Sequence, residues 1–289
     1  MFDEKIVCPA CGSFESISTE VSITQTGIGG IIYRRCLSCK SYFNPNMYQK
    51  IQKIKHIQQH TAYGNLRTGL ELVEYKSLMY RSILELIKRY FPPPANILDV
   101  GCSFGGFLVQ ARDSGYVGFG MDIFPEAVEY TRSLNFNVAL SDKICDVPFF
   151  KENELDIITI LDTNYYFPDQ PRELLEAWKK LKSGGFLVMR VSDKNWLFSF
   201  GLFLSKIYPK IASKIVRRAI NDHLFSMPVK SLLRLLVSLE FKILYASPSS
   251  AMHSKNSSFA VKMAFRLGYL VWKFTGSFIA PGCVIIAQK

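Results

Sequence analysis

The feature that most constrains this fold is the run Ile97-Leu98-Asp99-Val100-Gly101-Cys102-Ser103-Phe104-Gly105-Gly106-Phe107. An apolar strand leads here into a glycine-rich turn and then into a helix that begins with small residues. This arrangement lets backbone amides approach an adenosine-type ligand. The glycines stand at positions 101, 105 and 106, whereas the dinucleotide fingerprint requires G-x-G-x-x-G after the strand. The spacing therefore disfavours a nicotinamide dinucleotide.

Strand and helix patterns alternate through the rest of the chain. Strands are expected near residues 97–101, 117–121, 136–140, 155–161, 185–191, 241–247 and 282–287. Helices are expected near 105–115, 125–134, 170–182 and 228–239, and Ser183-Gly184-Gly185 is interpreted as a helix stop and turn before the fifth strand. Alternation of this kind predicts an α/β fold with a parallel sheet and helices on both faces.

Four cysteines near the N-terminus form two C-x-x-C pairs, Cys8 with Cys11 and Cys36 with Cys39. Two such pairs suit one tetrahedral zinc ion, and residues 16–32 have the pattern of a short hairpin between the pairs. The pattern predicts a zinc ribbon, which either serves as structure or substrate lid or binds nucleic acid. Two disulfides and four unrelated thiols are the alternatives, although a cytosolic chain seldom keeps disulfides.

The motifs together resemble the class I S-adenosylmethionine (SAM) methyltransferases. The glycine-rich turn, Asp99 and Asp122 carry the core resemblance, while CPACGS and RRCLSCKSYFNP are similar to bacterial zinc-ribbon methyltransferases with a ubiquinone-biosynthesis-like core. The resemblance implies a Rossmann-like seven-stranded sheet with helices on both faces, preceded by the ribbon. The expected domains are a zinc ribbon at 1–47, a helical linker or cap at 48–94 and the methyltransferase core at 95–289.

The resemblance also implies which residues hold the cofactor. Asp122 ends the second strand and is expected to bind both ribose hydroxyls, and Asp99 is expected to accept from the ammonium group, directly or through water. Asp142 is the candidate for the adenine amino group, with Asp146 as the alternative. The other expected cofactor contacts come from the turn and from strand ends, and are Gly101, Cys102, Ser103, Gly105, Ile123, Leu161 and Asp162.

The segment after the fourth strand departs from the family pattern. Many relatives have an acidic-His pair there, whereas this chain reads Thr163-Asn164-Tyr165-Tyr166-Phe167-Pro168, which removes the most obvious general base. Tyr165 and Tyr166 are expected either to contact the methyl acceptor or to pack. His223 stands where relatives often carry a histidine near the acceptor, so it is expected to act in catalysis or binding. The alternative is that His223 only fixes the conformation of its loop. These three residues are the catalytic candidates.

Two segments, about 192–227 and 249–281, interrupt the alternation and combine apolar with basic residues. Both are expected to follow the carboxyl ends of central strands, where ligands bind in open α/β sheets, and to cover the acceptor as lids. Plain packing and an interfacial helix on a membrane are the alternatives.

The formal net charge of +11 is compatible with nucleic acid, anionic lipid or an anionic substrate. The basic residues are dispersed, and no recognition motif for RNA stands out. No apolar run reaches the roughly 18 residues that span a bilayer, and the first residues lack a signal-peptide pattern, so a cytoplasmic protein is expected. The leading prediction is O-methylation of a small-molecule, sugar or lipid-linked acceptor. An RNA methyltransferase and a non-catalytic SAM-binding regulatory subunit are the competing hypotheses.

Overall fold

A computed structural model describes residues 6–14, 17–25, 28–44, 66–205, 207–220, 223–249, 259–279 and 282–289. Residues 48–65 of the expected linker and 250–258 of the second expected insertion lie outside these ranges. Among the described residues, no helix combines the length and apolar character needed to cross a membrane.

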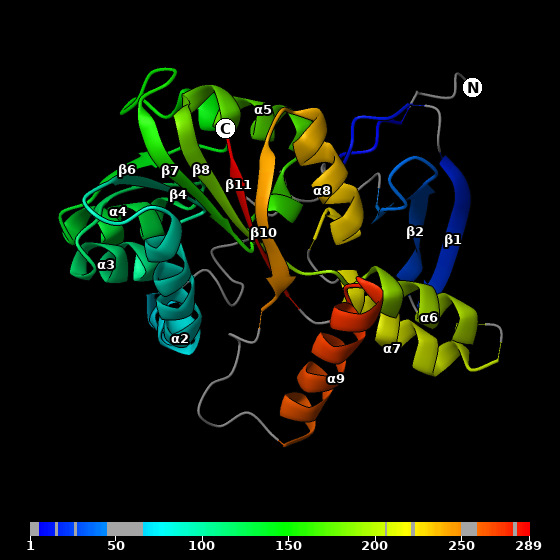
Figure 1. The fold of residues 1–289 in the computed structure, drawn as a ribbon. Coiled ribbons are helices and arrows are strands. Elements are labelled where there is room, and N and C mark those ends of the chain that lie inside the picture. The colour runs from blue at the N-terminus through cyan, green and yellow to red at the C-terminus, as the bar shows by residue number, and fades with distance from the viewer. Residues whose placement is uncertain are drawn as a thin grey trace.

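Seven strands form the central sheet, in the order β10-β11-β8-β7-β4-β5-β6 (Figure 1). The strands are β4 (Asn96–Val100), β5 (Val117–Asp122), β6 (Asn137–Leu140), β7 (Leu155–Leu161), β8 (Leu181–Val191), β10 (Lys242–Pro248) and β11 (Cys283–Gln288). Strands β4 to β8 pair in parallel, whereas β11 is antiparallel to both β8 and β10. The predicted seven-stranded α/β sheet is confirmed, but the prediction that it is wholly parallel is wrong at β11.

The antiparallel strand also corrects the position of the second insertion. Strand β10 lies at the edge of the sheet, not at its centre. Antiparallel neighbours need no helical crossover, so the 249–281 segment is a long excursion between β10 and β11. Because Pro248, Cys283 and Val191 lie in register, the excursion still leaves from the edge where β8 ends.

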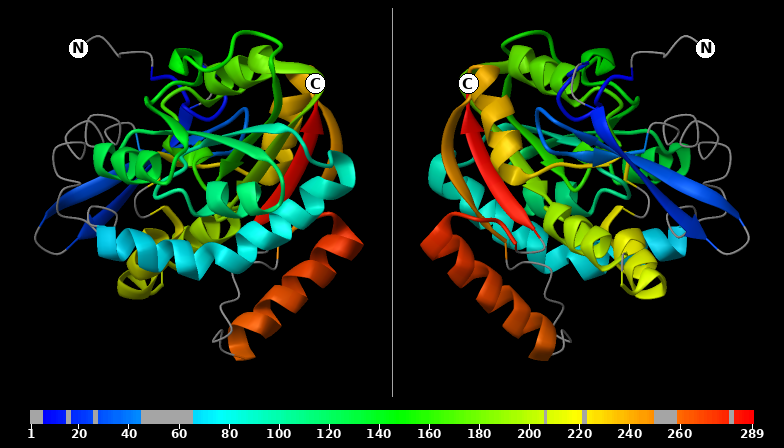
Figure 2. Two further views of the ribbon diagram at one scale, coloured as in Figure 1. Left: turned by 90° about the vertical axis from the view of Figure 1, so that its left-hand side faces the viewer. Right: turned by 90° about the vertical axis from the view of Figure 1, so that its right-hand side faces the viewer.

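Helices cover both faces of the sheet, as predicted (Figures 1 and 2). One face carries α2 (Leu66–Tyr90), α3 (Gly106–Asp113) and α4 (Pro125–Ser133), and the other carries α5 (Gln170–Lys180) and α8 (Val229–Ser238). Successive strand residues point to opposite faces: Ile157 and Val188 pack in the core under α2, while Ile158 and Met189 pack in the core under α5 and α8.

The ends of two helices test the predicted stop signals. Helix α2 ends at Tyr90, immediately before the Pro92–Pro94 run, because proline removes the amide that a further turn requires. Helix α5 ends at Lys180, earlier than predicted. The expected turn Ser183-Gly184-Gly185 lies inside β8, where Gly184 has a φ of 79° and the pairing with β7 shifts register.

The N-terminal segment forms a second, four-stranded sheet with the order β1-β2-β3-β9. Strands β1 (Ile17–Gln25) and β2 (Ile28–Cys36) form the predicted hairpin, and β3 (Tyr42–Phe43) pairs with β2. The fourth strand, β9 (Phe225–Ser226), comes from the first insertion. This pairing was not predicted from the sequence. Because of it, the ribbon and the first insertion share one sheet.

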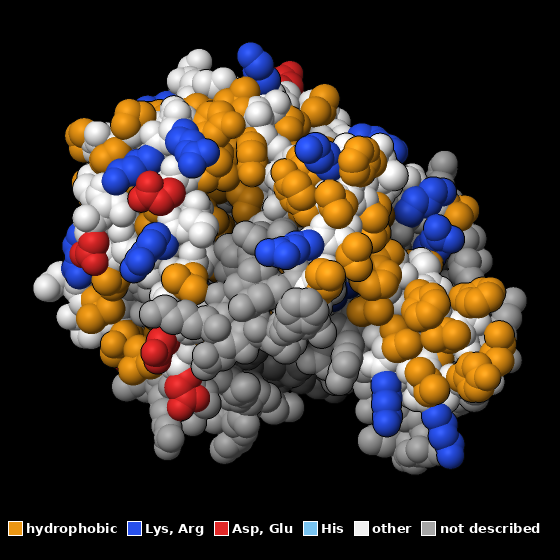
Figure 3. All heavy atoms as spheres, turned by 60° about the horizontal axis from the view of Figure 1, so that its bottom comes forward, with side chains coloured by type: hydrophobic (Ala, Val, Ile, Leu, Met, Phe, Trp, Pro, Cys, Tyr) orange, Lys and Arg blue, Asp and Glu red, His pale blue; other side chains and the backbone are white. Residues whose placement is uncertain are grey.

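The two insertions add three helices at one end of the molecule, the end shown in Figure 3. Helices α6 (Asn195–Ser205) and α7 (Pro209–Ile220) belong to the first insertion, and α9 (Phe259–Thr275) to the second. Phe198 of α6 is buried against Tyr33 and Tyr42 of the ribbon sheet, with ring centroids 5.2 and 4.1 Å apart. This contact holds the inner face of α6 against the ribbon.

Candidate active site

The glycine-rich turn between β4 and α3 brings the backbone close to its neighbours. Gly101 and Gly105 have φ values of 80° and 73°, which side-chain-bearing residues rarely adopt. A Cβ at Gly101 would overlap the side chain of Thr163, and one at Gly105 would lie 2.7 Å from Thr131. Gly105 caps α3 without a side-chain hydrogen bond. The turn therefore presents the amino end of a helix to the carboxyl edge of the sheet, which suits a polar ligand.

The predicted ribose residue, Asp122, lies beside this turn. Its Oδ2 accepts from the Ser103 amide at 2.8 Å and its Oδ1 accepts from the Phe124 amide at 2.9 Å. Burial raises the pKa of this carboxyl, and the amide bonds oppose the shift. The carboxylate is thereby fixed at the end of β5, while Ile123 follows it half-buried. Carboxylate oxygens have further lone pairs with which to accept from a diol.

Asp99 and Cys102 are both buried near the turn, in different ways. The Asp99 Oδ1 accepts from the Thr159 hydroxyl at 2.6 Å, and burial raises the pKa of Asp99 to about 7. The side chain of Cys102 packs into the core with Leu108 and Val138. Cys102 can therefore contact a ligand through its backbone, because its side chain is packed in the core. Asp99, with a pKa of about 7, changes its charge near neutral pH.

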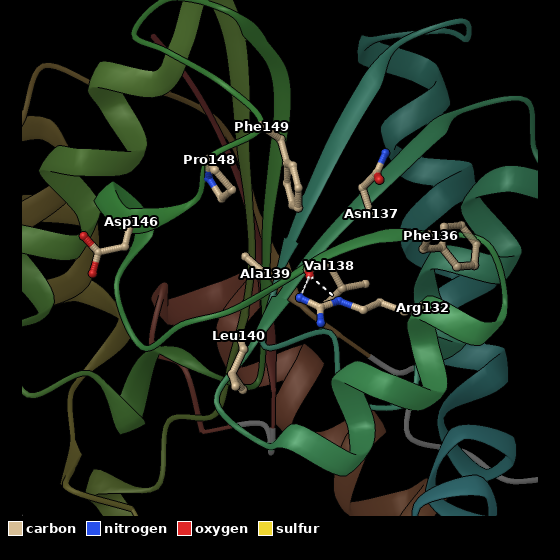
Figure 4. Close-up of a pocket in the computed structure, with 9 residues that line it drawn as sticks. All are labelled: Arg132, Phe136, Asn137, Val138, Ala139, Leu140, Asp146, Pro148 and Phe149. Atoms are coloured by element: carbon tan, nitrogen blue, oxygen red, sulfur yellow. Dashed lines mark hydrogen bonds between the residues drawn. The ribbon is translucent and has the colours of Figure 1, made fainter.

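The two adenine candidates lie on the segment after β6. Asp142 and Asp146 are both exposed, and Asp146 ends the short helix η2 (Ile144–Asp146). Asp146 also lines a hollow of about 440 Å³ beside edge strand β6, where Arg132 donates to the Val138 carbonyl (Figure 4). None of the other predicted cofactor residues lines this hollow.

Leu161 ends β7 and Asp162 follows it, and their side chains lie in different surroundings. Leu161 packs in the core under α2. Asp162 pairs with Arg190 of β8, and its Oδ2 lies 3.7 Å from the Lys76 ammonium of α2. Burial opposes ionisation, but Arg190 and Lys76 outweigh it and hold the pKa of Asp162 below its usual value. The carboxylate is thus engaged by two cations of the protein.

The three catalytic candidates are brought together by the fold. Tyr165 and Tyr166 lie in η3 (Asn164–Tyr166), directly after β7, and His223 precedes β9. The rings of Tyr165 and His223 stack with centroids 3.5 Å apart and planes 18° apart, while Tyr166 meets His223 edge-on at 5.7 Å. The Leu224 amide donates to the Tyr165 carbonyl at 3.0 Å. Residues 58 positions apart in the chain thus form one aromatic cluster.

The four N-terminal cysteines also converge. Their sulfurs all lie within 4.8 Å of one another, with Cys8 to Cys39 at 3.8 Å and Cys11 to Cys36 at 3.7 Å. A tetrahedral zinc site with Zn–S bonds of about 2.3 Å places its sulfurs about 3.8 Å apart. The arrangement of the thiols therefore fits a zinc ion.

Gln170 links this cysteine cluster to the aromatic cluster. Its backbone amide donates to the Pro9 carbonyl at 2.9 Å and its side-chain amide donates to the Ala10 carbonyl at 3.0 Å. Its Oε1 accepts from Asn164, the first residue of η3, at 2.8 Å. One buried glutamine thus connects the turn between Cys8 and Cys11 to the segment that carries Tyr165.

Arg190 and Gln170 were not predicted from the sequence. Arg190 is 1% exposed and stands as the single cation in the apolar stretch Phe186–Val191. A buried charge requires a partner, so this arginine was a readable signal for a carboxylate nearby. Gln170 carries no such signal, because a glutamine at the start of a helix is ordinary.

A family model described as a methyltransferase domain matches residues 75–246, which is more than half of the chain. An uncharacterized protein of Methanocaldococcus jannaschii is 26% identical over 171 residues, covering 59% of this chain and 75% of that protein. The 2-methyl-6-phytyl-1,4-hydroquinone methyltransferase of Synechocystis is 29% identical over 110 residues, covering 36% of this chain and 33% of that enzyme. The chain thus spans about a third of the length of the second relative.

Solved structures share the fold. The plantazolicin methyltransferase BpumL, in complex with S-adenosylhomocysteine (SAH), is similar with a TM-score of 0.51 and 16% identity, covering 84% of this chain and 98% of that one. A possible histamine N-methyltransferase of Thermotoga maritima gives a TM-score of 0.50 and 17% identity, covering 80% and 99%. The family match and the shared class I fold agree with the turn and carboxylates described above. The chain belongs to the methyltransferase domain family and is a SAM-dependent methyltransferase.

Proposed function

We propose that this enzyme methylates a hydroxyl oxygen of a small-molecule, sugar or lipid-linked acceptor. The observation that carries the proposal is the stack of Tyr165 on His223 at the carboxyl edge of β7. Thr163, two residues before Tyr165, packs on Gly101 of the glycine-rich turn. The aromatic cluster is therefore adjacent to the turn, as an acceptor site next to the cofactor must be.

The cofactor contacts follow from the turn. Asp122 is assigned to the ribose hydroxyls, Asp99 to the ammonium group and Asp142 to the adenine amino group, with Asp146 as the alternative for adenine. Gly101 and Gly105 support the assignment, because residues without a side chain let the backbone of the turn, Ser103 included, approach the cofactor closely.

SAM supplies an electrophilic methyl group on a sulfonium, and the protein orients the acceptor in line with it. Much of the barrier is lowered by this orientation and by exclusion of water. We assign acceptor positioning to Tyr165 and Tyr166. His223 takes the hydroxyl proton as the new C–O bond forms and the C–S bond breaks, with the electron pair remaining on sulfur as SAH leaves. A hydroxyl needs such a base, whereas an acceptor that is already ionised does not.

Zinc is assigned to the four cysteines as a structural ion. The sulfur separations support this assignment, as does the small size of the ribbon, since a metal replaces a hydrophobic core in segments of this kind. Zinc-bound thiolates suit a reducing compartment, so we place the enzyme in the cytoplasm. In this position zinc orders the ribbon and takes no part in the methyl transfer.

The proposal is tested with methyl-labelled SAM and an extract of the native cells, by identifying the product that gains the label. His223→Ala and Tyr165→Phe are expected to lower turnover about tenfold, equivalent to about 1.4 kcal/mol of barrier, at unchanged SAH affinity. Tyr75→Phe on the exposed face of α2 is the matched control. A label on nitrogen or carbon, or full turnover in both variants, would contradict the proposal.

A further inference from the structure

Helix α6 carries an apolar stripe that the described residues leave exposed. Trp196, Phe200 and Phe203 are exposed, and their spacing of four and then three residues places them on one face of the helix. Phe203 is 66% exposed. Phe198, on the opposite face, is fully buried against the ribbon sheet. Helix α6 therefore buries one aromatic face and leaves a second one open.

Helix α9 repeats this arrangement. Met263, Leu267, Leu270 and Phe274 are exposed and follow one another at spacings of four, three and four residues, so they form a single stripe. Phe274 is 80% exposed, a large fraction for a phenylalanine. More than half of the exposed large hydrophobic side chains in the described residues lie in the two insertions.

Basic side chains accompany both stripes. Arg266 and Lys273 are exposed seven residues apart on one flank of the α9 stripe, and Lys210 and Lys214 are exposed on α7, which packs against α6. The sequence contains no Asp or Glu between Lys194 and Asn221, and none after Glu240. Figure 3 shows the apolar and basic side chains gathered over these helices, with the acidic side chains elsewhere on that face.

We propose that α6, α7 and α9 form a docking surface for an anionic phospholipid bilayer, called here the bilayer surface. Exposed apolar stripes with basic flanks and no acidic residue are the composition of helices that lie in the interface of a membrane. Aromatic and leucine side chains enter the boundary between headgroups and acyl chains, and lysines and arginines attract the anionic headgroups. All three helices lie at the same end of the molecule in Figures 1 and 2, so one bilayer can meet them together.

A nucleic acid or a second copy of this chain would fit the composition of the bilayer surface less well than a bilayer does. A nucleic acid would use the cations, but the aliphatic side chains of Leu267 and Leu270 gain nothing from phosphates and do not stack on bases. A second copy of this chain would bring the same cations against one another, and like charges at an interface are unfavourable. A bilayer of anionic lipid uses both the apolar stripes and the basic flanks. The proposal does not depend on the identity of the methyl acceptor.

The test is flotation of the full chain with vesicles, without SAM or acceptor. We expect the protein to float with mixed phosphatidylcholine and phosphatidylglycerol vesicles and much less with phosphatidylcholine alone. Phe203→Glu and Phe274→Glu are each expected to lower partitioning into the vesicles roughly tenfold or more, because each removes a phenylalanine ring that would be buried in the bilayer. Val237→Glu, at an exposed position of α8, adds the same charge outside the bilayer surface and is the matched control.

A second pair of variants separates charge from apolar contact. Lys210→Glu combined with Lys214→Glu is expected to weaken flotation with the anionic vesicles, whereas Lys230→Glu combined with Lys242→Glu, also exposed, leaves it nearly unchanged. Retained SAH affinity in every variant shows that the protein is folded. The proposal is overturned if the wild-type protein floats with neither vesicle, or if Phe203→Glu and Phe274→Glu float as it does. It is also overturned if these variants instead abolish RNA binding or split a dimer in sedimentation velocity.

Discussion

The two halves of the candidate site are built in different ways. The turn and the carboxylates assigned to the ribose and the ammonium group of the cofactor come from one stretch, β4 to β5, in which Asp122 accepts from Ser103 only 19 residues earlier. The acceptor half joins the ribbon, η3, Gln170 and the segment before β9, with contacts that span up to 161 residues. The first half therefore depends on a local strand-turn-helix unit, whereas the second depends on the ribbon and the first insertion remaining in place.

The largest effect is expected at the ion pair where the acceptor half joins the sheet. Arg190→Met leaves the Asp162 carboxylate buried, with the Lys76 ammonium at 3.7 Å as its remaining salt-bridge partner among the described residues. Breaking a buried pair from one side costs about 3–5 kcal/mol, so we expect the free energy of unfolding in denaturant to fall by about that amount. The double variant Arg190→Met/Asp162→Asn removes both charges and is expected to recover part of the loss.

Acid sharpens this prediction. The pKa of Asp162 is lowered in the folded wild-type protein, so the contribution of the pair is present above the unfolded pKa of about 4 and is lost as pH falls through the folded pKa. In Arg190→Met, protonation of the Asp162 carboxyl removes the uncompensated buried charge and so stabilises the folded variant. The difference in free energy of unfolding between the wild-type protein and the variant should therefore narrow below about pH 4. A constant difference would show that Asp162 is not the group left uncompensated.

Removal of the proposed metal should impair the acceptor half of the site and leave the cofactor half nearly intact. Stripping the proposed zinc with a chelator, or replacing Cys36 by Ser, is expected to release the turn whose carbonyls accept from Gln170. We expect turnover to fall roughly a hundredfold as η3 loses its support, with SAH affinity changed less than about twofold. Elemental analysis should find one zinc per chain. Cys145→Ser, an exposed cysteine outside the cluster, is the control. Equal losses of turnover and SAH affinity would contradict the division into halves.

The reverse separation is expected at Asp122. Asp122→Ala removes the acceptor for two backbone amides and the proposed acceptor for the ribose hydroxyls, so we expect the free energy of SAH binding to weaken by about 1–3 kcal/mol. Calorimetric titration of SAH measures the change. Asp122→Asn retains one oxygen acceptor and should lose less SAH affinity. Asp113 is exposed at the end of α3, so the control variant Asp113→Ala should keep the full SAH affinity. An unchanged affinity would remove Asp122 from the site and with it most of the cofactor assignment.

The same contrast explains what the sequence could predict. The cofactor turn is readable because the strand, the glycines and Asp122 follow one another within one motif. The direction of β11 was not readable, because an apolar strand carries no mark of its direction. Strand β9 has two residues, too few to show a period. The Arg190 pair joins a residue of β8 to Asp162, which lies 28 positions earlier, just beyond the end of β7, and only the folded sheet brings them together.

The smallest expected effect concerns Asp99, whose carboxyl accepts a hydrogen bond from the hydroxyl of Thr159 on β7. Burial raises the pKa of Asp99 to about 7 in the ligand-free protein, so the proton is bound more tightly in the folded than in the unfolded state. Ligand-free stability should therefore decline as pH rises from about 4 through 7.

SAH affinity should move in the opposite direction, because only the ionised carboxyl of Asp99 can accept fully from the ammonium group. Between pH 6 and 8 we expect affinity to rise by up to roughly tenfold, following the ionised fraction. Calorimetry of SAH binding across this range measures the slope, and Asp99→Asn should flatten it. Thr159→Val removes the hydrogen bond that favours ionisation, so the midpoint should shift to higher pH. The same slope in Asp99→Asn as in the wild-type protein would assign the titration to another group and leave the ammonium of the cofactor without its proposed partner.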